Sequence, residues 1–227
     1  MTFLIIIIVL ALLFDYINGF HDAAISIATI VSTKVLTPFQ AVLWAAIFNF
    51  AAFFIFKYFI GEFRIGNTIA NFVSRDFITL PVIFSGLIAA ICWNLFTWWF
   101  GIPSSSSHTL LGGFVGAALA HAGGWVVGGK NVVDYGSVIP TFLFIGLAPL
   151  IGMLVALVIT ILIVNLFRKS HPYRAENWFR RLQLVSSALL SLGHGGNDAQ
   201  KVLGIIAAAM VAHGDLDNIR HIPNWVP

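Results

Sequence analysis

Two aspartates, each inside a small polar cluster, stand out in this chain because their surroundings are apolar. Asp22 lies in Gly19–Ala23, after a stretch from Phe3 to Phe14 without a charged residue, and Asp198 lies in the matching cluster Gly195–Ala199. If these stretches cross a membrane, a carboxylate inside one costs about 2.5–3.5 kcal/mol on insertion scales. Ionisable groups at such positions usually serve function, so we take this pair as the centre of a candidate site.

A third polar cluster, Ser104–Ser107, directly follows Pro103. Proline favours the first turn of a helix, and the free N–H groups of a helix N-terminus bind anions, assisted by nearby hydroxyl groups. The serine run therefore indicates an anion site. The alternative is that these serines only cap the start of a helix.

An anion beside two aspartates requires a cation. Two bare like charges about 4 Å apart repel by about 4 kcal/mol at an effective dielectric constant of about 20. A Na⁺ ion or a proton on each acid removes this repulsion, so the pattern predicts that cation and anion favour each other's binding. Because imidazole can exchange a proton under physiological conditions, His21 is either a proton carrier or a hydrogen-bonding partner of a neighbouring helix.

The composition indicates a membrane protein. Of the 227 residues, 59% are hydrophobic and 9% are charged, whereas soluble domains carry about 25% charged residues. The expected fold class is an all-α integral membrane protein with several transmembrane helices. Runs of spanning length predict about six of them, at 3–30, 39–60, 78–100, 102–122, 139–167 and 182–212. Sequence motifs of metalloproteases, nucleotide-binding proteins and serine hydrolases are missing, so we expect neither an enzyme nor a cofactor.

Basic residues predict the orientation of the chain. The segment 168–181 holds five Lys or Arg residues and one Glu, which is typical of a cytoplasmic loop rather than of a nucleic-acid site. Counting back through five spans places the N-terminus outside. The first and sixth spans then run in opposite directions, so the two motif copies form an inverted pair, as in many secondary transporters. Because Asn18–Gly19 and Gly193–Gly196 are poor helix formers, we expect both spans to be broken helices.

The three motifs, in this order, resemble those of the inorganic phosphate transporter (PiT) family, of bacterial type. The segments 19–26 and 195–201 are similar to its duplicated Gly-Ala-Asn-Asp-type motif, and 101–108 is similar to its Pro-x-Ser-Ser/Thr-Ser/Thr-His element. The resemblance covers nearly the whole chain. It implies symport of inorganic phosphate with Na⁺ or H⁺ across the bacterial inner (plasma) membrane.

The resemblance also implies site residues. Phosphate contacts are expected at Ser104, Ser105, Ser106, Ser107, Asn197, Gly195 and Gly196, and cation contacts at Asp22, Asp198, Asn18 and His21. The only metal ion expected is Na⁺, at Asp22 and Asp198. The Phe20-His21-Asp22 form is more similar to the bacterial branch that uses protons or takes up a metal–phosphate complex.

Two departures from the family pattern affect these expectations. Ile25 stands where the first motif usually has a second asparagine, which leaves the cation ligands of that half incomplete. Family members also continue well past the second motif, so we expect a chain truncated in its second repeat. The expected division is a first repeat at 1–167, a basic cytoplasmic loop at 168–181 and the start of the inverted repeat at 182–227. A homodimer or a complementing half is left open as the partner.

The favoured hypothesis is secondary active transport of inorganic phosphate. Two alternatives stay open at this point. One is a permease for another oxyanion, such as sulfate. The other is a channel-like or regulatory membrane protein that uses the same scaffold without coupling.

Overall fold

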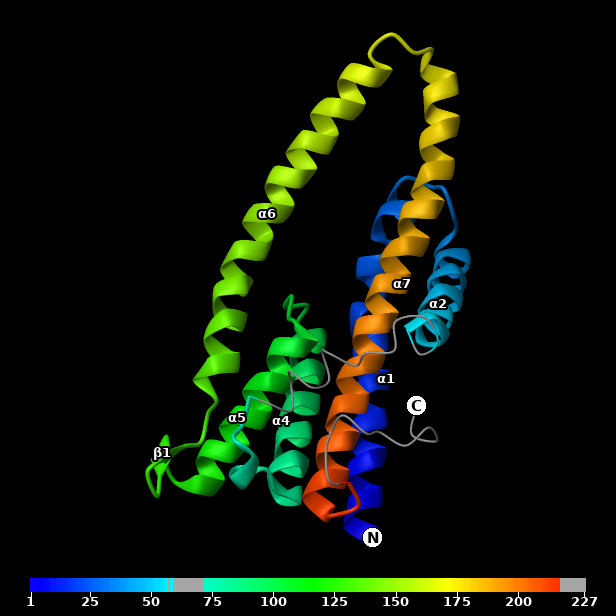
Figure 1. The fold of residues 1–227 in the computed structure, drawn as a ribbon. Helices are drawn as coiled ribbons and strands as arrows, with labels where there is room; N and C mark the ends of the chain where they lie inside the picture. The colour runs from blue at the N-terminus through cyan, green and yellow to red at the C-terminus, as the bar shows by residue number, and fades with distance from the viewer. Residues whose placement is uncertain (57, 59–71, 217–227) are drawn as a thin grey trace.

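The computed structural model describes residues 1–56, 58 and 72–216, and these residues form a helical bundle from which one hairpin of helices extends (Figure 1). The helices are α1 (Thr2–Ser32), α2 (Pro38–Ile55), α4 (Leu80–Trp99), α5 (Ser106–Ala122), α6 (Tyr135–Phe167) and α7 (Pro172–His213). A short 3₁₀ helix, η2 (Arg75–Phe77), precedes α4, and an antiparallel pair, β1 (Val126–Val127) and β2 (Lys130–Asn131), connects α5 to α6. The predicted all-α fold class is confirmed.

Among the described residues, four helices are long and apolar enough to cross a membrane: α1, α2, α4 and α6. The fourth predicted span corresponds to α5, which has 17 residues. The sixth corresponds to α7, whose 42 residues include several charged ones. The end of the span predicted at 39–60, most of the loop predicted at 61–77 and the last residues of the region 182–227 lie outside the described residues.

The basic loop predicted at 168–181 is wrong in its boundaries. Helix α7 begins at Pro172, so most of that segment is helical. Proline suits the first helical position because its missing N–H group has no partner there in any helix. The solvent-exposed first turns are further supported by an ion pair between Glu176 and Arg180, 3.0 Å apart and four residues along the chain.

The prediction of broken helices is also wrong. Both α1 and α7 continue as α-helices through Asn18–Gly19 and Gly193–Gly196. A glycine in a helix costs about 1 kcal/mol relative to alanine, whereas each unpaired backbone group inside a bilayer costs several kcal/mol. A continuous helix is therefore the less costly solution unless other groups pair with the exposed backbone.

Helices α1 and α7 lie side by side in opposite directions (Figure 1). Near one end Thr33 Oγ1 donates a hydrogen bond to Gln183 Oε1 at 2.9 Å, and at the other end the Met1 amino group lies 3.1 Å from His213 Nε2. The two aspartate motifs, one in each helix, therefore run antiparallel. This arrangement confirms the predicted inversion of the two copies.

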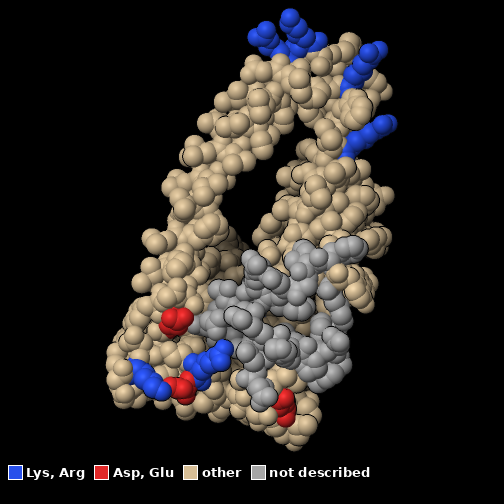
Figure 2. Space-filling model, viewed as in Figure 1, with Lys and Arg blue, Asp and Glu red and all other residues tan. Residues whose placement is uncertain are grey.

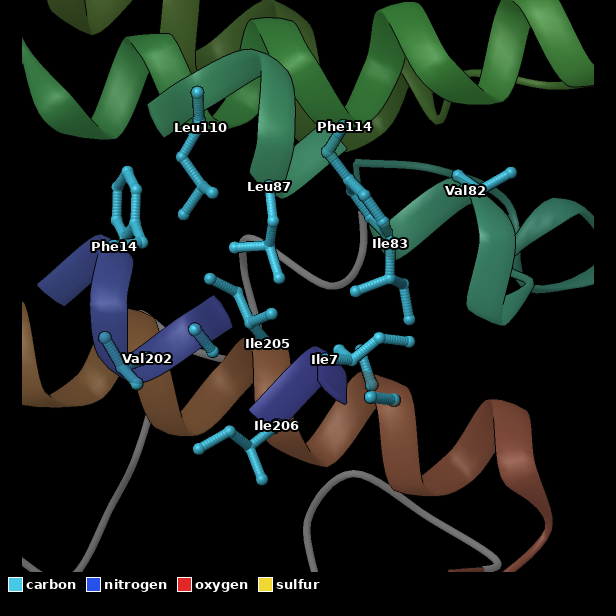
Figure 3. Packing of buried hydrophobic residues seen from close by; sticks show 14 of the residues in the cluster. Ile7, Phe14, Val82, Ile83, Leu87, Leu110, Phe114, Val202, Ile205 and Ile206 are labelled. Atoms are coloured by element: carbon cyan, nitrogen blue, oxygen red, sulfur yellow. The ribbon is translucent and has the colours of Figure 1, made fainter. Parts of the chain in front are cut away.

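Apolar side chains from α1, α4, α5 and α7 form the core. Figure 3 shows Ile7 and Phe14 of α1, Leu87 of α4, Phe114 of α5 and Ile205 of α7 meeting between their helices. In a bilayer such side chains stabilise the fold by van der Waals packing, because lipid tails are as apolar as they are. This core fixes the relative positions of the three helices that carry the polar motifs.

The serine-rich turn is held in place by close packing of α5 on α4. A Cβ atom at Gly113 would lie 2.6 Å from the carbonyl oxygen of Gly86, so the two backbones approach closely only because both residues lack side chains. Residues 103–105 precede α5 in a non-helical conformation. The N-terminus of α5 is thereby positioned against α1 and α7.

The remaining helix, α6, has no buried residue. It leaves the bundle and returns through a short turn to α7 (Figure 1). Figure 2 shows Lys and Arg side chains gathered around this turn on the visible face, whereas both signs of charge occur at the opposite end. The basic residues near the turn are Arg168, Lys169, Arg174, Arg180 and Arg181.

Candidate functional site

A pocket of about 360 Å³ lies where α1, α7 and the start of α5 meet. It is lined by residues of all three polar motifs: Asp22, Ile25, Ser104, Ser105, Ser106, Ser107, His194, Asn197, Asp198 and Lys201. Its walls are polar in a molecule whose other surfaces are mostly apolar. The three motifs, far apart in the sequence, therefore form a single site.

Asp22 is buried, with only 5% of its surface exposed. Its Oδ1 lies 3.0 Å from His21 Nδ1, and its Oδ2 accepts a hydrogen bond from Ser106 Oγ at 3.3 Å. His194 Nε2 of α7 lies 3.9 Å from the same Oδ2. Asp22 thus has polar neighbours from three elements, but no lysine or arginine among them within 4 Å in the described part of the chain.

His21 links α1 to α4. While Nδ1 faces Asp22, Nε2 lies 3.4 Å from Thr97 Oγ1. If Asp22 is ionised, Nδ1 must carry the proton, because a carboxylate only accepts hydrogen bonds. This geometry is that of a hydrogen-bonding partner of a neighbouring helix, one of the two roles that its position in the sequence allows.

Asp198 has a different set of neighbours. Its Oδ1 accepts a hydrogen bond from Lys201 Nζ at 2.7 Å, and its Oδ2 lies 3.1 Å from His194 Nε2. Lys201 Nζ also donates to Ser106 Oγ at 3.4 Å. The Lys201 ammonium therefore connects α7 to the serine turn, while His194 lies between the two aspartates.

The side chains of α1 present several buried oxygens that lack partners. Asn18 and Ser26 lie one helical turn before and one turn after Asp22, and neither Asn18 Oδ1 nor Ser26 Oγ has a hydrogen-bond partner. Ser191 Oγ, on the face of α7 that carries His194, is also buried and unpaired. A buried oxygen without a partner costs about 1–3 kcal/mol. Oxygens of this kind beside a carboxylate suit a bound cation or water.

Most predicted site residues meet in the pocket, but two glycines do not. Gly195 and Gly196 do not line it. They face α2, where a Cβ atom on Gly195 would lie 2.6 Å from Asn49 Cα and one on Gly196 would overlap the ring of Phe56. Since α7 is continuous, we correct their predicted role as phosphate-binding amides to a role in helix packing. Asn18 and His21 adjoin Asp22 without lining the pocket.

Lys201 and His194 line the pocket but were not predicted as site residues. Lys201 is 7% exposed, and Asp15, two turns before Asp22 in α1, interacts electrostatically with both Asp198 and Lys201. A signal was present in the sequence, because an ionisable residue in an apolar helix is costly unless it is paired. Both Lys201 and His194 contact Asp198 within α7, whereas their other partners, Ser106 and Asp22, lie in other helices and become visible only in the fold.

Comparison with known proteins gives consistent matches. A family model described as "Phosphate transporter family" matches residues 18–175 and 166–227. A "Probable low-affinity inorganic phosphate transporter" of Rhizobium meliloti is 47% identical over 96% of this chain and 63% of its own length. A protein of the same description from Bacillus subtilis is 38% identical, with 98% and 64% covered. The chain thus spans less than two thirds of the length of these relatives.

A solved structure, described as "The sodium-dependent phosphate transporter", has the same fold. It superposes with a TM-score of 0.84 over 100% of this chain and 72% of the other, at 22% sequence identity. At this identity the likeness establishes the architecture alone.

Proposed function

This chain belongs to the phosphate transporter family, and we propose that it carries inorganic phosphate across a membrane together with Na⁺ or H⁺. The observation that carries the proposal is the pocket in which two buried aspartates face the serine-rich N-terminus of α5. Such a pocket offers donors to an anion and carboxylates to a cation. The relatives are longer than this chain, and the proposal concerns transport by the whole protein.

Phosphate would bind at the start of α5. The first N–H groups of that helix have no partner within the helix, and its macrodipole favours a negative charge there. The hydroxyls of Ser104–Ser107 and the amide of Asn197 line the same pocket and supply additional hydrogen-bond donors. These groups are the phosphate ligands that we propose.

A cation would bind on the α1 side of the pocket. Asp22 supplies a carboxylate, and the unpaired oxygens of Asn18 and Ser26 lie one turn away on either side. Oxygen ligands of this kind suit Na⁺ as a hard cation. The structural neighbour is described as sodium-dependent, which makes Na⁺ the first ion to test and H⁺ the second.

Coupling follows from the charges in the pocket. With Asp22 and Asp198 both ionised, a phosphate anion about 4 Å away meets about 4 kcal/mol of repulsion per acid at an effective dielectric constant of about 20. A cation at Asp22 reduces that repulsion, and phosphate in turn favours the cation by the same free energy. This reciprocity distinguishes symport from an uncoupled channel.

The orientation and the assembly of the protein complete the proposal. Basic residues at the turn between α6 and α7 favour a cytoplasmic location for it. We therefore propose that the N-terminus is outside. Helix α6, with no buried residue, would be covered by lipid and by protein that completes the second repeat, either in the same polypeptide or in a partner copy.

Uptake of radiolabelled phosphate into proteoliposomes tests the proposal. We expect uptake to increase under an inward Na⁺ or H⁺ gradient and to resist competition by a tenfold excess of sulfate. An uptake rate that changes with neither gradient would indicate an uncoupled channel. Equal competition by sulfate would show a general oxyanion permease.

A further inference from the structure

The two copies of the inverted motif differ in the residues that surround their acids. When Asp22 is aligned with Asp198, Ile25 aligns with Lys201, and both of these side chains line the pocket. In the same alignment the oxygen-bearing residues Asn18 and Ser26 of the first copy correspond to His194 and Val202, respectively, of the second. Each copy also holds a histidine near its acid, and His21 of the first copy aligns with Asn197 of the second. The clearest difference is that the ammonium group of Lys201 lies beside the acid of the second copy, where the first copy has Ile25.

Lys201 occupies the position that a cation would take beside Asp198. Its Nζ lies 2.7 Å from Asp198 Oδ1 and 3.4 Å from Ser106 Oγ. The lysine is three residues after the aspartate, a spacing at which side chains meet on one face of a helix. With 7% of its surface exposed, the ammonium is held in the pocket rather than extended into solvent.

The other charged and titratable groups near Lys201 are mostly acids. Asp15 interacts electrostatically with both Asp198 and Lys201, and Asp22 shares Ser106 with the ammonium. His194 lies between the two acids and is charged only if protonated. Of these acids, Asp198 is the one whose carboxylate contacts the ammonium, at 2.7 Å.

We propose that Lys201 is a tethered cation that neutralises Asp198, so that the second half of the site requires no mobile cation. The mobile cation then binds beside Asp22, where unpaired oxygens are available and no lysine of the described residues lies within 4 Å. The proposal rests on the proposed function and makes it more specific, since it assigns the coupling cation to one of the two half-sites. It also gives Lys201 a role distinct from that of a direct phosphate ligand.

The test is the Na⁺ dependence of phosphate binding by the purified full chain. Equilibrium binding of radiolabelled phosphate is measured over a range of Na⁺ concentrations, with choline replacing Na⁺ at constant ionic strength. In Lys201→Gln, we expect Na⁺ to take the place of the missing ammonium. The number of Na⁺ ions taken up with each phosphate, obtained from the slope of log Kd against log Na⁺ concentration, should then rise by about one.

Three further variants make the test specific. Lys201→Arg keeps the charge and should keep the native slope. The double variant Asp198→Asn with Lys201→Gln removes both charges and should also keep the native slope. Lys169→Gln removes an exposed lysine near the turn between α6 and α7 and should change nothing.

Two results would overturn the assignment. If Lys201→Gln weakens phosphate binding by the same factor at every Na⁺ concentration, the lysine contacts phosphate directly. If the variant binds phosphate as the native chain does, the ammonium has no role. Absence of phosphate binding by the native chain would instead contradict the proposed function. In that case Na⁺ titration of the melting temperature without phosphate decides on Lys201. A larger Na⁺-dependent rise in Lys201→Gln than in the native chain supports the assignment, and an equal rise refutes it.

Discussion

At the scale of single residues, Ser106 connects the two halves of the site. Its hydroxyl donates to Asp22 Oδ2 and accepts from Lys201 Nζ, so one side chain at the start of α5 contacts a charged residue of α1 and one of α7. Such a group both positions the charges and faces the proposed phosphate. Its removal should therefore affect ligand binding more than folding.

We predict that Ser106→Ala raises the Kd for phosphate roughly 3- to 10-fold, because one hydrogen bond to a ligand or to a charged group contributes about 1 kcal/mol. Equilibrium binding of radiolabelled phosphate measures the change. Ser170→Ala, an exposed serine at the turn before α7, serves as the control. An unchanged Kd for Ser106→Ala would remove the serine turn from the site.

Ile25 gives a second prediction at this scale. It lines the pocket three residues after Asp22, where a carboxamide would add an oxygen ligand. We expect Ile25→Asn to lower the Na⁺ concentration for half-maximal phosphate binding roughly 3- to 10-fold, which is about 1 kcal/mol of added cation affinity. Ile25→Leu should leave it unchanged. If the asparagine variant behaves like the leucine variant, position 25 does not contact the cation.

The chemistry of single residues was predictable where a side chain conflicts with its apolar surroundings. Asp22, Asp198 and the serine run satisfy this criterion from sequence alone. Lys201 also meets this criterion, although its partner Ser106 could not be predicted, whereas Gly195 does not meet it. The contact of Lys201 with Ser106 joins residues far apart in the sequence, and the glycine meets α2 only after folding. A glycine beside an acid suits either a ligand-binding turn or a close helix contact, and only the fold decides between them.

At the scale of elements, α7 packs closely on α2 near the site. Gly195 allows it, because any Cβ atom there would lie within 3 Å of the Asn49 backbone. Two residues earlier, Gly193 faces open space within the same helix. The two glycines therefore form a matched pair for testing whether the contact stabilises the bundle.

We predict that Gly195→Ala lowers the free energy of unfolding by about 1–3 kcal/mol. The added methyl group would clash with backbone atoms of α2, which cannot move aside as the end of a flexible side chain can. Gly193→Ala should be neutral or stabilise by up to about 1 kcal/mol, since alanine favours the helix. Melting temperatures of the purified variants in detergent give the comparison. Equal melting temperatures would show that α2 does not pack on α7 at Gly195.

The sequence predicts the long helices correctly, but it wrongly predicts breaks in α1 and α7. Hydropathy identifies long helices because the bilayer requires continuous backbone hydrogen bonding. The same requirement explains why α1 and α7 are not broken at their glycines. The start of α7 at Pro172 was missed because its first turns are polar, and a hydropathy criterion finds helices in lipid rather than in solvent.

At the scale of the whole molecule, charge is distributed unevenly along the bundle. Lys and Arg side chains gather at the turn between α6 and α7, and the opposite end carries both signs of charge (Figure 2). The fold makes α1 and α7 antiparallel, but the direction of the bundle in the membrane depends on this charge asymmetry.

We predict that the turn between α6 and α7 is cytoplasmic and that the hairpin of β1 and β2 is outside. In a chain with Cys92 replaced by serine, Asn131→Cys should react with a membrane-impermeant thiol reagent in intact cells. Ser170→Cys should react only after the cells are permeabilised. The reverse pattern of labelling would place the N-terminus inside.

The central claim is that phosphate moves with a cation held at Asp22. Gradient-driven uptake of radiolabelled phosphate into proteoliposomes tests it most directly when the native chain, Asp22→Asn and Asp76→Asn are compared. Asp76 is an exposed acid that pairs with Lys130 far from the pocket. We predict native uptake in Asp76→Asn and a loss of at least about 10-fold in Asp22→Asn, equivalent to about 1.4 kcal/mol. Uptake by Asp22→Asn equal to that of the native chain, under the same Na⁺ or H⁺ gradient, would contradict the account.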